Sequence, residues 1–120
     1  MAHTHATLLL VDDDAMNRDA LSRRLERSGY TVLLAEGGAE ALELAATQHV
    51  DLVLLDVMMP GLSGIETLKR LRTVRFLADL PVIMVTAKDA SGDMVEALDL
   101  GANDYITKPV DYAVALARIR

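Results

Sequence analysis

The chain has 120 residues, of which 18 are acidic and 12 are basic, so its formal net charge is −6 at pH 7. This length fits one domain, and 52% hydrophobic with 25% charged residues is typical of a globular rather than a disordered protein. The acidic balance argues against direct binding to nucleic acid phosphates, and the lack of cysteine excludes disulfides, thiolate metal sites and a cysteine nucleophile. We expect a cytoplasmic protein without a membrane segment, because no apolar run approaches the roughly 18 residues that a span needs.

Short apolar runs alternate with amphipathic segments from the start of the chain. Residues 1–6 are predicted to form a flexible tail, and residues 7–11 (TLLLV) a buried strand. Asp14 is suited to cap a helix that runs from Ala15 to about Ser28. The side chains predicted to face inward from this helix are Met16, Ala20, Leu21 and Leu25.

The alternation continues through the middle of the chain. A second strand is predicted at residues 30–35, a helix at 39–47 and a third strand at 51–55. A Ser-x-x-Glu capping box at Ser63 then begins a helix that ends near residue 74.

The last third of the chain adds two further strand–helix units. Strands are predicted at residues 82–85 and 104–107, a helix at 91–100, and a final helix that Asp111 caps and that runs to the end. Strands that alternate with helices of this length favour right-handed crossovers and a parallel sheet covered on both faces. The sequence therefore predicts an open α/β domain over residues 7–120, with its ligand site at the carboxyl ends of the strands.

Polar side chains follow four of the five predicted strands, and they would meet in one crevice. The polar residues at these strand ends are Asp12, Asp13, Asp14, Asp56, Thr86 and Lys108, and the small Ala87 follows Thr86. Clustered carboxylates repel one another unless a proton or a cation joins them, and their hard oxygens suit Mg²⁺ or Mn²⁺. A lysine and a threonine beside such a cation can hold a phosphoryl group, and an aspartate can be the nucleophile that accepts it.

Four motifs resemble those of the response-regulator receiver domain, the phosphoacceptor module of two-component signalling. The motifs are LLLVDDD (8–14), DLVLLDVMMPGLSG (51–64), PVIMVTA (81–87) and GANDYITKP (101–109). Their order and spacing are those of that family, and together the motifs extend over nearly the whole chain. The resemblance implies a flavodoxin-like, CheY-like fold of five strand–helix units with strand order 2-1-3-4-5.

The resemblance also implies roles for individual residues. Asp56 would be phosphorylated, and the ligands of Mg²⁺ (or Mn²⁺) would be Asp12, Asp13, Asp56 and the backbone carbonyl of Met58. The phosphoryl group would be bound by Thr86, Ala87 and Lys108. Thr86 and Tyr105 would move together as a switch, and the Lys108–Pro109 peptide bond would be cis. Met58 and Lys88 would border the path of the water that hydrolyses the phosphoryl group, and neither side chain is suited to help that water.

The partners implied are a histidine kinase or phosphotransfer domain as donor, and an output domain or downstream protein as receiver of the signal. Phosphorylation would change the face formed by the fourth helix, fifth strand and fifth helix. On that face Asp104 and Arg118 resemble a pair found in dimerising regulators, whereas Met94 and Glu96 stand where those relatives have basic residues. We therefore expect at most a weak homodimer, with no nucleic acid or membrane contact by this domain. The last helix is expected to continue past residue 120 toward an output region.

Two other functions compete with this interpretation. Asp12-x-Asp14 after a strand resembles the motif of haloacid-dehalogenase phosphatases, with Asp12 as nucleophile, although Met16 is atypical there and no second acidic pair appears late in the chain. A pseudo-receiver, which binds a partner without chemistry, would have the same fold. Only the phosphatase would be an enzyme; a receiver assists no more than its own phosphorylation and dephosphorylation.

Overall fold

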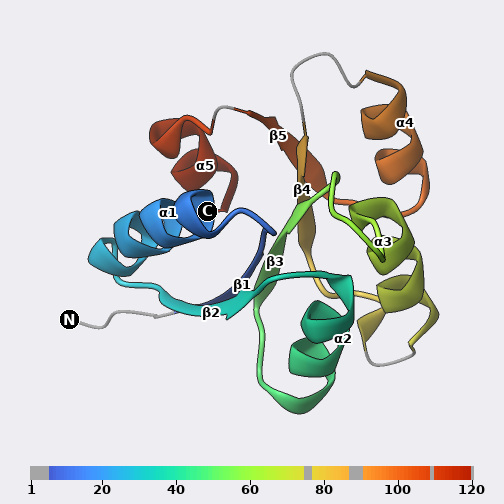
Figure 1. Ribbon diagram of the computed structural model, residues 1–120, viewed down its shortest axis with the longest axis horizontal. Helices are drawn as coiled ribbons and strands as arrows, with labels where there is room; N and C mark the ends of the chain where they lie inside the picture. The colour runs from blue at the N-terminus through green and yellow to red at the C-terminus, as the bar shows by residue number, and fades with distance from the viewer. Residues whose placement is uncertain (1–5, 75–76, 87–90, 109, 120) are drawn as a thin grey trace.

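The computed structural model of the chain describes residues 6–74, 77–86, 91–108 and 110–119. Five parallel strands form one sheet in the order β2-β1-β3-β4-β5, which confirms the predicted fold (Figure 1). The strands are β1 (Thr7–Val11), β2 (Thr31–Ala35), β3 (Leu52–Asp56), β4 (Val82–Thr86) and β5 (Asp104–Thr107). The helices are α1 (Ala15–Arg27), α2 (Gly38–Thr47), α3 (Gly64–Thr73), α4 (Ser91–Asp99) and α5 (Tyr112–Ile119).

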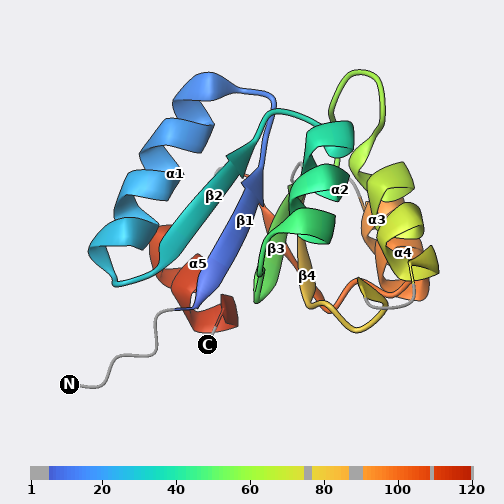
Figure 2. The ribbon, with the colours of Figure 1, turned by 90° about the horizontal axis from the view of Figure 1, so that it is seen from below.

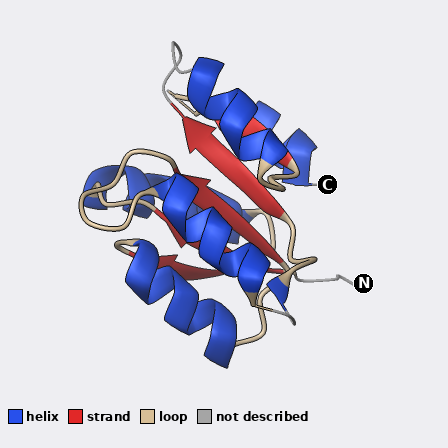
Figure 3. Cartoon of the chain, turned by 90° about the vertical axis from the view of Figure 1, so that its right-hand side faces the viewer, coloured by secondary structure: helices blue, strands red, loops and turns tan. Residues whose placement is uncertain are grey.

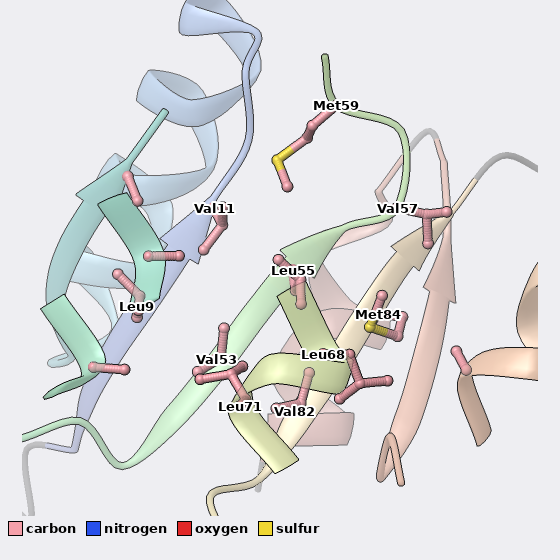
Figure 4. Close-up of a cluster of buried hydrophobic side chains, with 14 of the residues drawn as sticks. Leu9, Val11, Val53, Leu55, Val57, Met59, Leu68, Leu71, Val82 and Met84 are labelled. Carbon is pink, nitrogen blue, oxygen red and sulfur yellow. The ribbon is translucent and has the colours of Figure 1, made fainter. Parts of the chain in front are cut away.

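Helices cover both faces of the sheet (Figures 2 and 3). Figure 2 shows α1 and α5 on one side and α2, α3 and α4 on the other. Side chains alternate between the two faces along each strand, so each strand contributes to two cores. The core under α2, α3 and α4 includes Leu9, Val53, Leu55, Leu68 and Met84 (Figure 4). The core under α1 and α5 includes Leu8, Leu10, Leu25, Leu54, Ile83 and Ala115. Burial of each of these leucine side chains stabilises the fold by about 1.5–3 kcal/mol. The two cores therefore hold the strands, and with them the polar residues at the strand ends, in fixed positions.

The predicted inward face of α1 is wrong at two positions. Met16 is 82% exposed and Ala20 is also exposed, whereas Ser22 and Leu25 are buried. The inward stripe runs through residues 18, 21, 22 and 25, which is the helical spacing of i, i+3, i+4 and i+7. Hydrophobicity misled the prediction because the stripe begins at a charged residue, Arg18, and not at the methionine two positions earlier.

Asp51, the residue directly before β3, holds the start of β1 through two hydrogen bonds with Thr7. Its Oδ2 accepts a hydrogen bond from the backbone N–H of Thr7 at 2.7 Å, while its own N–H donates to the Thr7 carbonyl at 2.8 Å. His49 lies against the same carboxylate, with Nε2 2.9 Å from Oδ1. The Thr7 N–H, more than the nearby His49, lowers the pKa of the Asp51 carboxyl below its ordinary 3.8. This residue was predicted to open the third strand and instead fixes the neighbouring one.

Replacing Asp51 with alanine should lower the free energy of unfolding at pH 7 by about 1 kcal/mol or less, because the carboxylate is partly open to solvent. A carboxyl whose pKa is lower in the folded state stabilises above its unfolded pKa and loses that effect as the pH falls through the folded value. The deficit of the variant should therefore shrink below pH 3.8. Urea unfolding of both proteins at several pH values measures it, with Asp19→Ala as an exposed control, and a deficit independent of pH would contradict this role.

Candidate functional site: an acidic crevice at the strand ends

Three carboxylates meet at the carboxyl edge of the sheet. Oxygens of Asp12, Asp13 and Asp56 all lie within 4.8 Å of one another. The strand register explains why the carboxylates of Asp12 and Asp56 lie close together. Val11 of β1 lies beside Leu55 of β3, and the next residues along the chain are these two aspartates. Asp12 and Asp56 are buried, at 7% and 2% exposure, and Asp13 faces solvent. The fold thus brings together three of the four aspartates that the sequence placed at strand ends.

The fourth of these aspartates, Asp14, is a helix cap. Its Oδ1 accepts hydrogen bonds from the backbone N–H groups of Met16 and Asn17, at 2.9 and 3.2 Å, and so begins α1. Its own N–H donates to Oδ1 of Asp12 at 2.8 Å. Asp14 therefore stabilises the turn that presents the cluster and does not join it.

Asp56 is the most enclosed of the three acids and has a cationic partner. Lys108, which follows β5, places its Nζ 3.1 Å from Oδ2 of Asp56, and the Met58 N–H donates to Oδ1 at 3.3 Å. Burial raises the pKa of the Asp56 carboxyl, the hydrogen bond and charge of Lys108 oppose that rise, and the charge of Asp12 adds to it. Among the described residues, one ammonium group is thus set against three carboxylates, which leaves these side chains with an excess of negative charge.

Thr86 supplies a buried hydroxyl for which the described residues offer no hydrogen-bond partner. It ends β4 beside Thr107 of β5, is 1% exposed, and its Oγ1 makes no hydrogen bond within the described part of the chain. An unsatisfied buried hydroxyl costs about 1–3 kcal/mol, so such groups are rare in folded proteins without a functional reason. Its backbone carbonyl accepts a hydrogen bond from Lys108 N–H at 2.7 Å, which ties together the two strand ends that carry the hydroxyl and the ammonium.

The other predicted site residues divide into two groups. Met58 is 68% exposed in the loop after β3, and Tyr105 is half-buried on β5, where it packs against the core under α2, α3 and α4. The remaining three lie outside the described residues: Ala87, Lys88 and Pro109.

Two residues near the site were missed in the sequence. The Arg18 guanidinium donates to the Asp12 carbonyl, with Nη1 2.7 Å from the oxygen. Gly64 opens α3 so close to the end of β3 that a Cβ would overlap the Asp56 carbonyl and Val57 Cα. A signal existed for Gly64, because glycine is a poor choice for a helix position directly after the Ser63 cap. The sequence offered none for Arg18, whose partner is a backbone atom.

The residues of the crevice fit a small divalent cation. Hard carboxylate oxygens from two strand ends, one of them exposed, match the preference of Mg²⁺ and Mn²⁺ for oxygen ligands and retained water. The excess negative charge favours the same occupant. The unpartnered Thr86 hydroxyl and the Lys108 ammonium are suited to an anion with several oxygens that would sit beside such a cation.

Comparison with known sequences gives one family. The sequence model of the response regulator receiver domain matches residues 8–120. The chain is 48% identical over 113 residues to the uncharacterized transcriptional regulatory protein YkoG of Bacillus subtilis and 46% identical to response regulator MprA of Mycobacterium ulcerans. Both alignments cover 94% of this chain but 49% and 48% of those proteins, so the chain spans about half the length of the curated relatives it matches.

Solved structures give the same result for the fold. The chemotaxis response regulator CheY4 of Vibrio cholerae has a TM-score of 0.90 at 31% identity, with 97% of each chain covered. The Francisella response regulator 1452 receiver domain has a TM-score of 0.88 at 34% identity, covering 96% of this chain and 93% of that one. None of the helices in the described part of the chain is long and apolar enough to span a membrane.

Millimolar Mg²⁺ should stabilise the domain by relieving the repulsion among the three carboxylates. At ten times its dissociation constant, a ligand bound only by the folded state adds about 1.4 kcal/mol, which is roughly 5 °C in melting temperature for a domain of this size. Asp13→Asn should raise the melting temperature in metal-free buffer and weaken the response to Mg²⁺. Thermal unfolding with Mg²⁺, and with NaCl at matched ionic strength, measures both effects. Equal responses to the two salts would show that the acids do not form a cation site.

Proposed function

The chain belongs to the response-regulator receiver family, and from that premise we propose that it accepts a phosphoryl group on Asp56 from the phosphohistidine of a histidine kinase or phosphotransfer domain. The observation that carries the proposal is the buried Thr86 hydroxyl, without a hydrogen-bond partner among the described residues, near the Asp56–Lys108 pair. A carboxylate, an ammonium and a free hydroxyl together offer a nucleophile and two groups that hold phosphoryl oxygens.

In the proposed reaction an Asp56 carboxylate oxygen attacks phosphorus in line with the imidazole of the donor. A P–O bond forms, the P–N bond breaks, and its electron pair stays on the imidazole nitrogen. The product is an acyl phosphate on Asp56 and a free histidine on the donor. Asp56 is 2% exposed, so the crevice limits the water that competes with this transfer.

Two side chains would hold the transferred group. The Lys108 ammonium would pair with a phosphoryl oxygen while it remains near Asp56, and the Thr86 hydroxyl would donate to another. Asp12, Asp13, Asp56 and the Met58 carbonyl would hold Mg²⁺, which when bound would supply positive charge beside the phosphoryl oxygens. Ala87, beyond the described residues, is proposed to contribute its backbone to the same group.

The signal would leave the site through Thr86 and Tyr105. Once Thr86 turns toward the phosphoryl group, the half-buried Tyr105 on β5 is proposed to follow it and change the face formed by α4, β5 and α5. An output domain or downstream protein would read that face, in line with the greater length of the curated relatives. Asp104 and Arg118 form an ion pair within the chain at 3.6 Å, so any homodimer through this pair would have to exchange it between copies.

Treatment with acetyl phosphate and Mg²⁺ should modify Asp56 and no other residue. Peptide mapping by mass spectrometry should find the adduct in the wild type and in the exposed control Asp19→Asn, and Asp56→Asn should abolish it. Adduct that survives Asp56→Asn would refute the assignment. Its location on Asp12 would favour a phosphatase-like reaction, and its absence from all the proteins would favour a pseudo-receiver.

Met58→Asn should speed autodephosphorylation about tenfold, which corresponds to about 1.4 kcal/mol of barrier. The Met58 side chain is 68% exposed and its N–H lies 3.3 Å from Oδ1 of Asp56, so an amide there can orient a water that the thioether cannot. Lys88, beyond the described residues, is proposed to leave hydrolysis equally unassisted because its charged amine accepts no proton.

The decay of the phosphorylated protein at fixed Mg²⁺ measures this effect. Met16→Asn is the matched control, since Met16 is an exposed methionine (82%) at the start of the helix that follows β1. Equal or slower decay in Met58→Asn than in the control would show that this side chain does not govern access of water.

A further inference from the structure

We propose that Arg18 is a positioning residue for the cation site, which it serves by orienting the peptide bond between Asp12 and Asp13. The inference rests on the proposed function, because it assumes that these two acids hold a divalent cation. Arg18 makes no ion pair within the described part of the chain. Its guanidinium instead donates a 2.7 Å hydrogen bond from Nη1 to the backbone carbonyl of Asp12.

The position of Arg18 on α1 directs its guanidinium toward the turn that follows β1. Its side chain belongs to the inward stripe of the helix and is half-buried, whereas its neighbours Asn17 and Asp19 are exposed. The Asp14 cap fixes where the helix starts, and Arg18 N–H donates to the Asp14 carbonyl at 2.9 Å in the first turn. The guanidinium therefore approaches the turn after β1 from a rigid element.

Planarity of the peptide bond carries the effect to the second ligand. The carbonyl of Asp12 and the N–H of Asp13 belong to one rigid plane, so a bond that fixes the carbonyl also fixes the direction in which Asp13 leaves. The rest of Asp12 is already held, with its N–H on the Ala35 carbonyl at 3.2 Å and its Oδ1 on Asp14 N–H at 2.8 Å. Arg18 supplies the remaining constraint on the peptide that joins two ligands.

A positioning role and a purely electrostatic role predict opposite results. If Arg18 acted only as a positive charge near the site, its removal would reduce repulsion and tighten the binding of Mg²⁺. If it orients the peptide, its removal should weaken binding, because the two carboxylates would converge less often. The sign of the change in affinity therefore separates the two roles.

The test compares Arg18→Met, Arg18→Lys and the control Arg23→Met, which removes an exposed cation of the same helix paired with Asp19. Calorimetric titration with Mg²⁺ should give a dissociation constant about fivefold to tenfold higher in Arg18→Met and unchanged in Arg23→Met. Arg18→Lys, which keeps one donor and the charge, should fall between Arg18→Met and the wild type. Phosphorylation by acetyl phosphate should need correspondingly more Mg²⁺ and reach a near-normal rate at saturation.

Unchanged or tighter Mg²⁺ binding in Arg18→Met would overturn the inference, as would an equal weakening in Arg23→Met. A lower melting temperature in metal-free buffer with an unchanged dissociation constant would show a structural role only and would also overturn it. If Arg18→Met does not fold, Arg18→Lys decides, and wild-type affinity in that variant counts against the proposal. Failure of the wild type itself to bind Mg²⁺ would refute the proposed function, whereas a binding wild type with an indifferent Arg18 refutes this step alone.

Discussion

Mutual repulsion among three carboxylates is the constraint on which the rest of this structure depends. Oxygens of Asp12, Asp13 and Asp56 lie within 4.8 Å of one another, and in the described part of the chain the Lys108 ammonium is the ion-pair partner of one of them, Asp56. Such a cluster disperses unless a rigid frame holds its members. The parallel sheet is that frame, because the register of β1 on β3 fixes Asp12 beside Asp56 while two apolar cores hold the strands from either face.

Two further costs fall on the same edge of the sheet. Burial raises the pKa of Asp56, and the Thr86 hydroxyl is buried with no partner in the described structure. Both features destabilise the isolated domain, and in the proposed function both would be relieved by one event, the binding of a cation together with a phosphoryl group. Strain that a ligand relieves is a reason for the ligand to bind, so the same features that weaken the fold make the site selective.

The sequence was sufficient where a residue's position follows from its place on a strand. Asp12, Asp56, Thr86 and Lys108 were placed at one edge of the sheet because parallel strands bring their carboxyl ends together whatever the side chains in between. Their roles stay predictions. It was insufficient where the role depends on a contact with the main chain. Arg18 binds a carbonyl, which leaves no pattern of spacing or charge, and Gly64 makes room for one, which only the presence of glycine at a helix start could signal. The error at Met16 has the same origin, since Arg18 occupies the inward position that hydrophobicity assigned to the methionine.

The two halves of the crevice differ in how firmly they are held, and this difference suits a switch. On the β1 side Asp12 is fixed through its N–H, its carbonyl and its carboxylate, so the acids present an almost preformed cation site. On the β4 side the Thr86 backbone is bound to Lys108, while its hydroxyl makes no hydrogen bond with the described residues. A ligand that contacts both sides would change the β1 side little, because Asp12 is already held there. Its binding energy would instead favour a new conformation on the β4 side. In the proposed function, the conformational change would therefore spread from Thr86 toward β5 and α5, while α1 would keep its position.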